Sequence, residues 1–217
     1  MKILILGATG ATGRLFTSLA AADGHDVRAL VRDASTAGLP TTVSTVQGDA
    51  RSARDVTAAM EGREVVVSAL GMGMKTRPDG LMLDATRALI TASASAGVRR
   101  LVMLSSWGVG ETLQRSSLLT RLVYQAGKAV HDEKADAERE LRASDVEWTL
   151  VYPVALTNGP VSGRVRARDV ADVRRMRGLP RISRADVAAA MLDIVVSDRD
   201  DTRRTVVLDV LKRRRLT

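Results

Sequence analysis

The residues best suited to chemistry form a glycine turn near the start of the chain. Gly7, Gly10 and Gly13 follow the apolar run 3–6, each three residues after the last, and apolar residues then recur with helical spacing. Glycine allows a tight turn, close approach of backbone to a phosphate, and close packing of a helix on a strand. Unpaired N–H groups at the start of such a helix bind anions. The pattern therefore predicts a site for the pyrophosphate of a dinucleotide.

Basic residues near this turn indicate which dinucleotide is bound. Arg32 follows a second strand-like run, at the place about 20 residues beyond the glycines where an NAD site usually has Asp or Glu. A guanidinium can hold a 2′-phosphate in a bidentate pair, so Arg32 favours NADP, and Arg14 is a second candidate contact. Ordinary surface arginines are the alternative for both. Asp33 keeps NAD open, because a rotated loop would present its carboxylate instead.

The run Gly7–Arg14, GATGATGR, resembles the opening of the atypical and extended short-chain dehydrogenase/reductases. It is most similar to their small NAD(P)H-binding group, which includes NmrA-like proteins and the flavin reductase/biliverdin reductase B type. Residues 48–50 resemble the family's element that contacts adenine, and residues 68–71 resemble its segment beside the ribose and nicotinamide. With two later passages, 134–153 and 182–188, the resemblance extends from residue 1 to about 209.

This resemblance implies that Ser105 and Ser106 lie at the reactive end of the cofactor. Short-chain reductases place a catalytic or substrate-positioning serine after the corresponding strand, with Ser105 nearer the cofactor and Ser106 nearer the substrate. A hydroxyl there can donate a hydrogen bond to an oxygen that gains negative charge as hydride arrives. Simple capping of a loop is the alternative for the pair.

The family's proton donor and its helper are a Tyr and a Lys four residues apart, and the chain offers two assignments. Tyr124 and Lys128 have that spacing. The similarity of the later passage instead assigns the lysine to Lys134 and places Val130 where the tyrosine would stand, so the standard acid is missing. Lys134 is then a catalytic candidate that binds the cofactor ribose. A solvated lysine paired with Glu138 is the alternative.

The candidate cofactor contacts belong to the glycine turn or to the carboxyl ends of the predicted strands. They are Gly7, Thr9, Gly10, Ala11, Thr12, Gly13, Arg14, Arg32, Asp49, Ala50, Ala69, Leu70, Gly71, Ser105, Lys134, Tyr152 and Pro153. Candidates for an apolar floor under the substrate come from the segments that follow the fourth and fifth strands. They are Met72, Trp107 and Leu113, with Met74, Leu118 and Leu122 as further candidates, and ordinary packing is the alternative for each.

Strand-like and helical runs alternate along the chain. Strands are expected at 3–6, 27–31, 43–47, 65–70, 101–104 and 148–151, and helices at 12–22, 53–60, 81–96, 130–143 and 184–196. The alternation predicts an α/β protein with a Rossmann-type, doubly wound parallel sheet, in a single domain over 1–217. Residues 71–80 and 108–126 are expected to be cleft loops, and residues 154–182 a small C-terminal substrate lobe.

Composition excludes several classes of function. The chain has no cysteine and two histidines, so disulfides, thiolate chemistry and a histidine-rich metal site are not expected. A net charge of +8 attracts polyanions in general, but two Trp, two Tyr and one Phe cannot build many base-stacking platforms, and no nucleic-acid partner is expected. No apolar run approaches the length of a membrane span, and residues 1–6 are too short for a signal peptide. We therefore expect a cytoplasmic protein that does not associate with a membrane.

These features together predict an NADPH-dependent reductase that transfers hydride to a planar conjugated acceptor of the flavin, quinone, tetrapyrrole or enone type. Such acceptors delocalise the charge that a missing tyrosine would otherwise neutralise. The alternative is an NmrA-like redox sensor that binds NADP without turnover. A hydrolase using Ser106 and His131 is disfavoured, because no Gly-x-Ser-x-Gly motif surrounds the serine. A monomer and a dimer are both compatible with the sequence.

Overall fold

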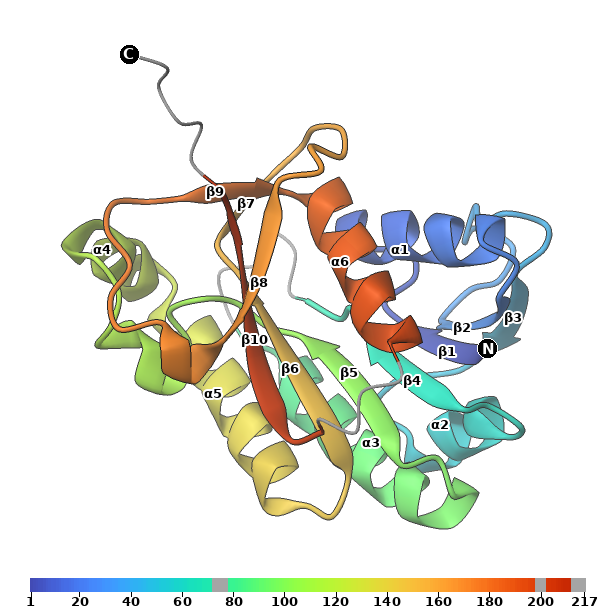
Figure 1. Ribbon diagram of the computed structural model, residues 1–217. Helices are drawn as coiled ribbons and strands as arrows, with labels where there is room; N and C mark the ends of the chain where they lie inside the picture. The colour runs from blue at the N-terminus through green and yellow to red at the C-terminus, as the bar shows by residue number, and fades with distance from the viewer. Residues whose placement is uncertain (72–77, 198–201, 212–217) are drawn as a thin grey trace.

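The computed structural model describes residues 1–71, 78–197 and 202–211. Its main sheet has eight strands in the order β3-β2-β1-β4-β5-β6-β10-β8, all parallel except β8, which runs antiparallel to β10 (Figure 1). The strands are β1 (Lys2–Leu6), β2 (Asp26–Val31), β3 (Ser44–Gln47), β4 (Val65–Ser68), β5 (Arg100–Leu104), β6 (Glu147–Pro153), β8 (Val165–Asp169) and β10 (Arg204–Val210).

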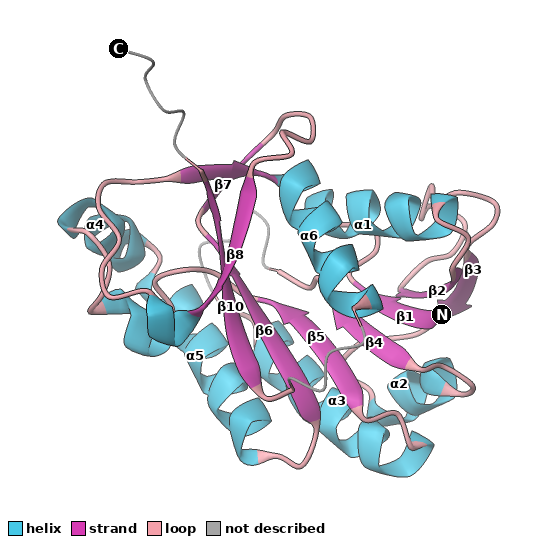
Figure 2. Cartoon of the chain, in the orientation of Figure 1, coloured by secondary structure: helices cyan, strands magenta, loops and turns pink. Residues whose placement is uncertain are grey.

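Helices cover both faces of this sheet (Figure 2). On one face α1 (Ala11–Ala22) packs against α6 (Arg184–Val196), and on the other α3 (Leu81–Ala96) packs between α2 (Ala53–Met60) and α5 (Lys128–Ala143). Because both faces are covered, the central strands are apolar throughout: the residues of β1 from Ile3 to Leu6 are fully buried. The predicted Rossmann-type α/β fold is confirmed.

Local signals set the bounds of three helices. The predicted bounds of α2, α3 and α6 agree with the structure residue by residue. Ser183 caps α6, since its Oγ accepts a hydrogen bond from Asp186 N at 2.9 Å. Gly97 ends α3 in the left-handed conformation with φ +71°.

The sequence pattern does not predict the strands β8 and β10, because charged residues interrupt both. The pairing of these two strands in the sheet accounts for the charged residues. On β10, Asp209 is 6% exposed and lies across from β8, where Arg166 donates to its two carboxylate oxygens at 2.9 and 2.8 Å. Arg168 donates to the same carboxylate at 2.7 Å. These cross-strand pairs satisfy charges that would otherwise argue against a strand.

The region predicted to form a small substrate lobe, 154–182, supplies β8 to the main sheet. It also contains β7 (Ala155–Thr157) and η2 (Val170–Asp172), and β7 pairs with β9 (Arg181–Ser183) in a two-stranded ribbon. The predicted cleft loop 108–126 is in fact largely helical, with η1 (Gly110–Leu113) and α4 (Leu118–Ala126). The two regions lie together: Met176 N donates to Arg115 O at 3.0 Å, and the Ser117 hydroxyl donates to Gly178 O at 2.5 Å.

Candidate functional site

The glycine turn links β1 to α1 at the point where the strand order reverses, between β1 and β4. Gly7 has φ +82°, and a Cβ atom there would lie 2.7 Å from the carbonyl carbon of Ala69, just after β4. A Cβ on Gly13 would lie 2.1 Å from Gly7 O. Both glycines are therefore required for the helix, the turn and the neighbouring strand to pack together.

The start of α1 is open to an anion. Gly10 is the N-cap residue and has no side chain to cap the helix, whose first residues are Ala11, Thr12 and Gly13. The N–H groups of a first helical turn have no partner within the helix and point away from its start. Gly10 differs from the other two glycines, since a Cβ there would lie 3.2 Å from Gly7 O and its φ of −72° suits any residue.

A cleft of about 340 Å³ lies beside this turn. Its walls come from the carboxyl ends of β1, β2, β3 and β4 and from the start of α3. The lining residues are Gly7, Thr9, Gly10, Leu30, Val31, Arg32, Gly48, Asp49, Ala50, Arg51, Ala69, Leu70, Gly71, Asp79 and Leu81. The structure thus brings together most of the predicted contacts to the adenosine half of a dinucleotide, which come from four separate segments of the sequence.

Arg32 is an exposed residue in this lining, and no described residue forms a hydrogen bond or an ion pair with it. The neighbouring Asp33 points its carboxylate into its own loop, where it accepts hydrogen bonds from Ser35 N at 2.9 Å and Ser35 Oγ at 2.6 Å. These hydrogen bonds lower the pKa of Asp33. Arg32 thus lines the cleft, whereas the carboxylate of Asp33 is bonded within its own loop.

Two other arginines near the cleft are already bonded. Arg14 donates to the main-chain oxygens of Ala37, at 3.1 Å, and Gly38, which fastens the loop after β2 to α1. Arg51, which the sequence analysis did not identify, donates to Asp79 O at 2.8 Å and lies 3.3 Å from the Asp79 carboxylate. It is also 3.8 Å from Asp84. The guanidinium groups of Arg14 and Arg51 thus have structural partners, whereas the guanidinium of Arg32 has none among the described residues.

The carboxyl ends of β5 and β6 carry a buried polar network. Ser105, Glu138 and Tyr152 are 5%, 4% and 1% exposed. The hydroxyl of Ser105 donates to Glu138 Oε1, and the hydroxyl of Tyr152 donates to Glu138 Oε2. Arg142 continues the network, donating to Thr205 Oγ1 at 2.8 Å while its guanidinium lies over the ring of Trp148 at 4.7 Å.

Burial and charge act against each other in this network. Burial raises the pKa of Glu138, while the hydrogen bonds from Ser105 and Tyr152 and the charges of Arg142 and Lys134 lower it. Burial raises the pKa of Tyr152, and so does the charge of Glu138. Tyr152, which is a predicted cofactor contact, thus has its hydroxyl bonded to Glu138. Sequence reasoning had considered Glu138 only as a solvated partner of Lys134, although it belongs to the family-like passage.

Lys134 and Ser106 lie next to this network. Lys134 is partly buried rather than solvated, so burial lowers its pKa, while the charge of Glu138 raises it. Ser106 directly follows Ser105, and its buried Oγ atom has no hydrogen-bond partner among the described residues. A buried hydroxyl without a partner is costly and needs an explanation such as a bound ligand or water. Pro153 is buried at the end of β6.

The geometry disfavours Tyr124 and Lys128 as the catalytic pair. The hydroxyl of Tyr124 donates to Asp132 Oδ1 at 2.9 Å, and Lys128 forms an ion pair with the other oxygen of Asp132. The ring of Tyr124 stacks on His131, with 4.6 Å between centroids. Burial and Asp132 raise the pKa of Tyr124 to about 12. A catalytic tyrosine needs a lowered pKa, whereas this cluster holds the phenol neutral.

The predicted substrate residues have different positions. Met72 and Met74 fall outside the described residues. Trp107 is 7% exposed and packs in the main core, and Leu113 is partly buried in η1. Leu118 and Leu122 are 73% and 68% exposed on α4. Of the described residues in this set, Trp107, Leu113, Leu118 and Leu122, none lines the cleft beside the glycine turn.

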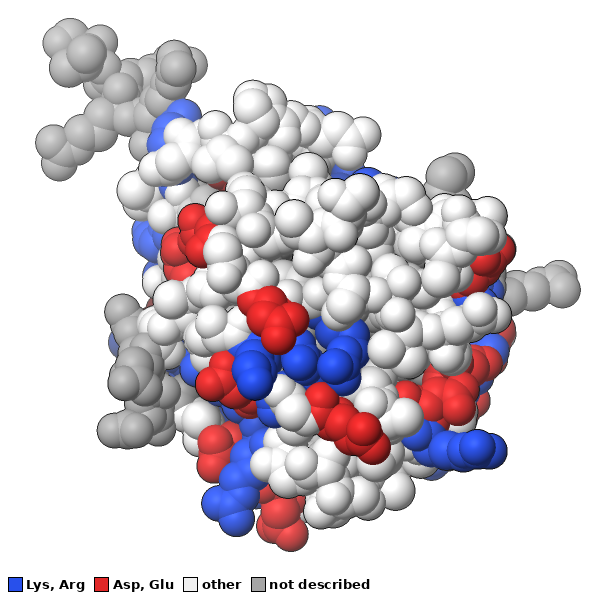
Figure 3. All heavy atoms as spheres, turned by 90° about the vertical axis from the view of Figure 1, so that its right-hand side faces the viewer, with Lys and Arg blue, Asp and Glu red and all other residues white. Residues whose placement is uncertain are grey.

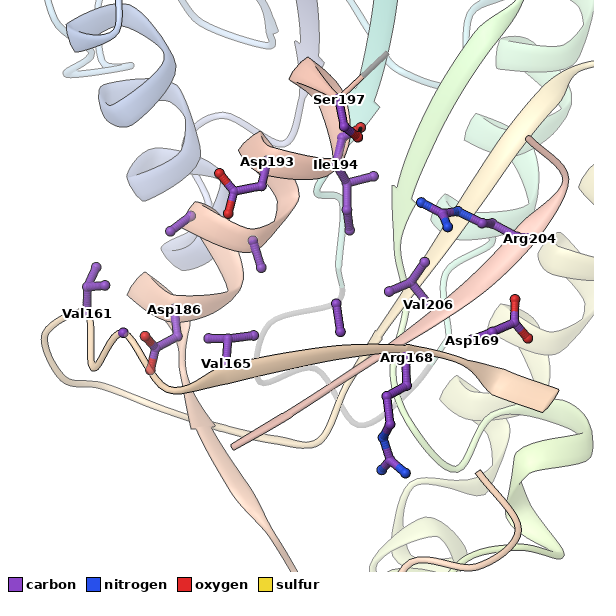
Figure 4. Close-up of a pocket in the computed structure, with 14 residues that line it drawn as sticks. Val161, Val165, Arg168, Asp169, Asp186, Asp193, Ile194, Ser197, Arg204 and Val206 are labelled. Carbon is purple, nitrogen blue, oxygen red and sulfur yellow. Dashed lines mark hydrogen bonds between the residues drawn. The ribbon is translucent and has the colours of Figure 1, made fainter. Parts of the chain in front are cut away.

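A second hollow of about 590 Å³ lies elsewhere, between α6 and the strands β8 and β10 (Figure 4). Val165, Val206 and Ile194 form much of its apolar wall. It contains none of the predicted site residues, because it lies on the α6 side of the sheet near the β8 edge.

Surface charge, metal-ligating side chains and helix length bear on three further kinds of partner: nucleic acids, metal ions and membranes. On the face that Figure 3 shows, basic side chains are interspersed with acidic ones and do not form a patch of one sign. Within the described parts of the chain, no three metal-ligating side chains are grouped in a way that could hold an ion. The helices that the structure describes are all too short or too polar to cross a membrane.

Comparison with known proteins gives one family. Residues 7–198 match the family described as NAD(P)H-binding. A curated relative, the "uncharacterized sugar epimerase YhfK" of Bacillus subtilis (strain 168), is 28% identical over 202 residues, which are 88% of this chain and 86% of the relative.

Solved structures share the fold. The "anaerobillin reductase" ChuY of Escherichia coli O157:H7 superimposes with a TM-score of 0.78 at 24% identity, covering 98% of this chain and 99% of ChuY. A short-chain dehydrogenase/reductase from Veillonella parvula DSM 2008, solved in complex with NADP, gives a TM-score of 0.79 at 18% identity, covering 95% and 93%.

Proposed function

Because this chain belongs to the NAD(P)H-binding family, we propose that it is an NADPH-dependent reductase of the atypical short-chain type, acting on a planar conjugated acceptor. The observation that carries the cofactor assignment is the cleft beside the glycine turn. It combines an uncapped helix start with Arg32, a guanidinium that no described residue engages. That combination fits a pyrophosphate and a 2′-phosphate. The structure solved with NADP supports the same choice by analogy of fold.

The residues at the two ends of the site have different proposed tasks. The N–H groups of Ala11, Thr12 and Gly13 hold the pyrophosphate, and Arg32 pairs with the 2′-phosphate. Lys134 donates to the nicotinamide ribose. When bound, NADPH supplies the hydride. Ser106 then donates its unused hydrogen bond to the acceptor atom on which negative charge develops.

The nature of the acceptor follows from the side chain at the tyrosine position. Val130 is partly buried and packs near Met82 and Ala137, so it offers no proton. A saturated ketone would become a strongly basic alkoxide and needs a positioned acid. A flavin, quinone, tetrapyrrole or enone spreads the charge over a conjugated system and takes its proton from water. The Escherichia coli protein ChuY, which shares the fold, is described as a reductase, and this supports a reductive role for the present chain.

The proposal is tested by following NADPH absorbance with each acceptor at matched concentration. We expect turnover with at least one of free flavin, a quinone, biliverdin or a conjugated enone, and none with a simple alkyl ketone. Fast turnover of the alkyl ketone would overturn the argument from Val130. Tight NADPH binding with no turnover of any acceptor would instead support a redox sensor, which uses the same cleft without the chemistry.

A further inference from the structure

The proposed mechanism does not use Glu138, although this carboxylate is buried among the polar groups at the reactive end. It is 4% exposed, and each of its oxygens accepts a hydroxyl hydrogen bond, from Ser105 after β5 and from Tyr152 on β6. Burying a carboxylate is costly unless it is paired and fully hydrogen-bonded. An exposed carboxylate on α5 would avoid this desolvation cost, so the buried position of Glu138 indicates a role beyond packing.

We infer that Glu138 is a positioning residue of the reductase site, which fixes the Ser105 hydroxyl and keeps the neighbouring Lys134 side chain charged. The inference rests on the proposed function, because it concerns the lysine assigned to the cofactor ribose. Lys134 lies one helical turn before Glu138 on α5, so the two side chains share one face of the helix. Glu138 is buried and Lys134 is partly buried.

The electrostatic surroundings of Lys134 leave this task to Glu138. Burial favours the neutral amine of Lys134, and the charge of Glu138 opposes that effect. The charge that acts on Lys134 is that of Glu138, although α5 carries other acids. Asp132 is bonded by Tyr124 and Lys128, Asp136 pairs with Arg139 at 2.9 Å, and Glu140 pairs with Arg87 of α3 at 2.6 Å. Glu133 Oε1 accepts a hydrogen bond from Met82 N of α3 at 2.7 Å, and its Oε2 has no partner among the described residues. His131 does not favour the charged form of Lys134, because the two positive charges repel each other.

The arrangement also explains why Ser105 and Ser106 differ. The hydroxyl of Ser105 is committed to Glu138, which fixes the backbone at the end of β5. The hydroxyl of Ser106, one residue later, has no partner in the described part of the chain, so it can donate to a ligand. Glu138 thereby orients the donor next in sequence through Ser105, without touching the reacting atoms.

The test is the titration of the Lys134 amine in the cofactor-free protein. The chain has five lysines, so the side-chain signals of ¹³C-lysine-labelled protein can be resolved and Lys134 assigned with Lys134→Gln. Glu138→Gln keeps the size of the side chain and one of its two accepting positions, but removes the charge. In this variant we expect Lys134 to lose its proton about one pH unit lower than in the wild type. Glu140→Gln, a carboxylate on the same helix paired with Arg87, is the matched control and should leave the Lys134 titration unchanged.

Cofactor binding gives the second readout. NADPH affinity measured from pH 6 to 10 should fall at high pH, and this fall should begin at lower pH in Glu138→Gln, with a loss of about tenfold near its midpoint. An unchanged Lys134 titration in Glu138→Gln would overturn the inference even if activity drops, because a purely structural residue does that too. Failure of the wild type to reduce any acceptor would contradict the proposed function and leave the titration result standing.

Should Glu138→Gln not fold, Tyr152→Phe tests the same network more gently. It removes one hydroxyl from Glu138, which raises the pKa of Glu138 and weakens its charge near neutral pH. Lys134 should then titrate at lower pH than in the wild type, by less than in the full substitution. A Lys134 titration that does not move, or moves to higher pH, would contradict the inference.

Discussion

At the glycine turn, backbone N–H groups and exposed side chains face the cofactor cleft, whereas at the ends of β5 and β6 the polar groups are buried and bonded to one another. The first region offers Arg32 to a ligand directly. The second encloses Glu138 between two hydroxyls, and the Ser106 hydroxyl beside them has no partner within the described ranges of the chain. An end that only binds can be built from local backbone shape, while an end that must orient a reacting group is fixed by contacts from several elements.

The two regions also treat charge differently. The arginines near the turn that have partners, Arg14 and Arg51, are held at the surface by carbonyls or acids, at little cost in desolvation. Glu138 and Lys134 are withdrawn from solvent, and burial shifts the pKa of each toward the neutral form. Substitutions in the first region should therefore change which cofactor binds, and those in the second should change what happens to it.

The largest effect is expected from Gly13→Ala. The new Cβ would meet Gly7 O at 2.1 Å, so α1 must move away from β1, at a cost of about 3 kcal/mol in the free energy of unfolding and with loss of cofactor binding. Thermal unfolding and NADPH titration measure both. Gly10→Ala is the control, because the φ of −72° at Gly10 suits alanine. Its new Cβ would lie 3.2 Å from Gly7 O, which is a tight contact but a much longer one than the 2.1 Å at Gly13. It should fold normally, and equal destabilisation of both variants would show that the close packing belongs to the whole turn.

Ser106→Ala should follow in size. Loss of a hydrogen-bond donor to developing charge is expected to lower kcat about 100-fold while NADPH affinity changes little. Lys134→Ala should weaken NADPH binding as well, since a ribose contact is already present in the ground state. Steady-state kinetics with the best acceptor, together with cofactor titration, separate the two. A Ser106→Ala variant with normal kcat would mean that the buried hydroxyl serves no transition state.

Arg32→Ala should remove cofactor preference. Wild type is expected to bind NADPH at least tenfold more tightly than NADH, because a charge-assisted bidentate pair contributes roughly 1.5–3 kcal/mol. The variant should bind both alike. Arg51→Ala is the matched control: its guanidinium is already paired with Asp79 and Asp84, so the ratio of the two affinities should stay as in the wild type. A preference that survives Arg32→Ala but disappears in Arg51→Ala would exchange their roles.

Tyr124→Phe should have the smallest effect. The phenol is bonded to Asp132 and its pKa is raised to about 12, so it stays neutral over the working pH range and its removal should leave kcat and its pH dependence unchanged. A loss of about 1 kcal/mol in stability is expected for the missing hydrogen bond. If Tyr124→Phe abolishes activity while Lys134→Ala does nothing, Tyr124 and Lys128 are the working pair after all.

The sequence predicted the cleft end of the site far better than the reactive end. Gly7, Gly10 and Arg32 were assigned from spacing and Asp49 from the family resemblance, and all four line the cleft. Arg51 was missed, because an arginine near an acid in a distant segment carries no signal in the sequence. At the reactive end Ser105 and Ser106 look alike in the sequence, and their opposite bonding is visible only in the fold.

The sequence by itself determined the Rossmann-type order of elements and the glycine turn, since helix caps, apolar runs and glycine φ angles depend on residues close together along the chain. Tertiary structure decided which polar groups meet. Glu138 contacts a hydroxyl 33 residues earlier and another 14 residues later only because β5 and β6 are neighbours in the sheet and α5 crosses their ends. The same holds for β10, whose Asp209 lies within a strand because β8 returns antiparallel and brings Arg166 and Arg168 to it. Such pairings depend on strand order and register, which local composition does not encode.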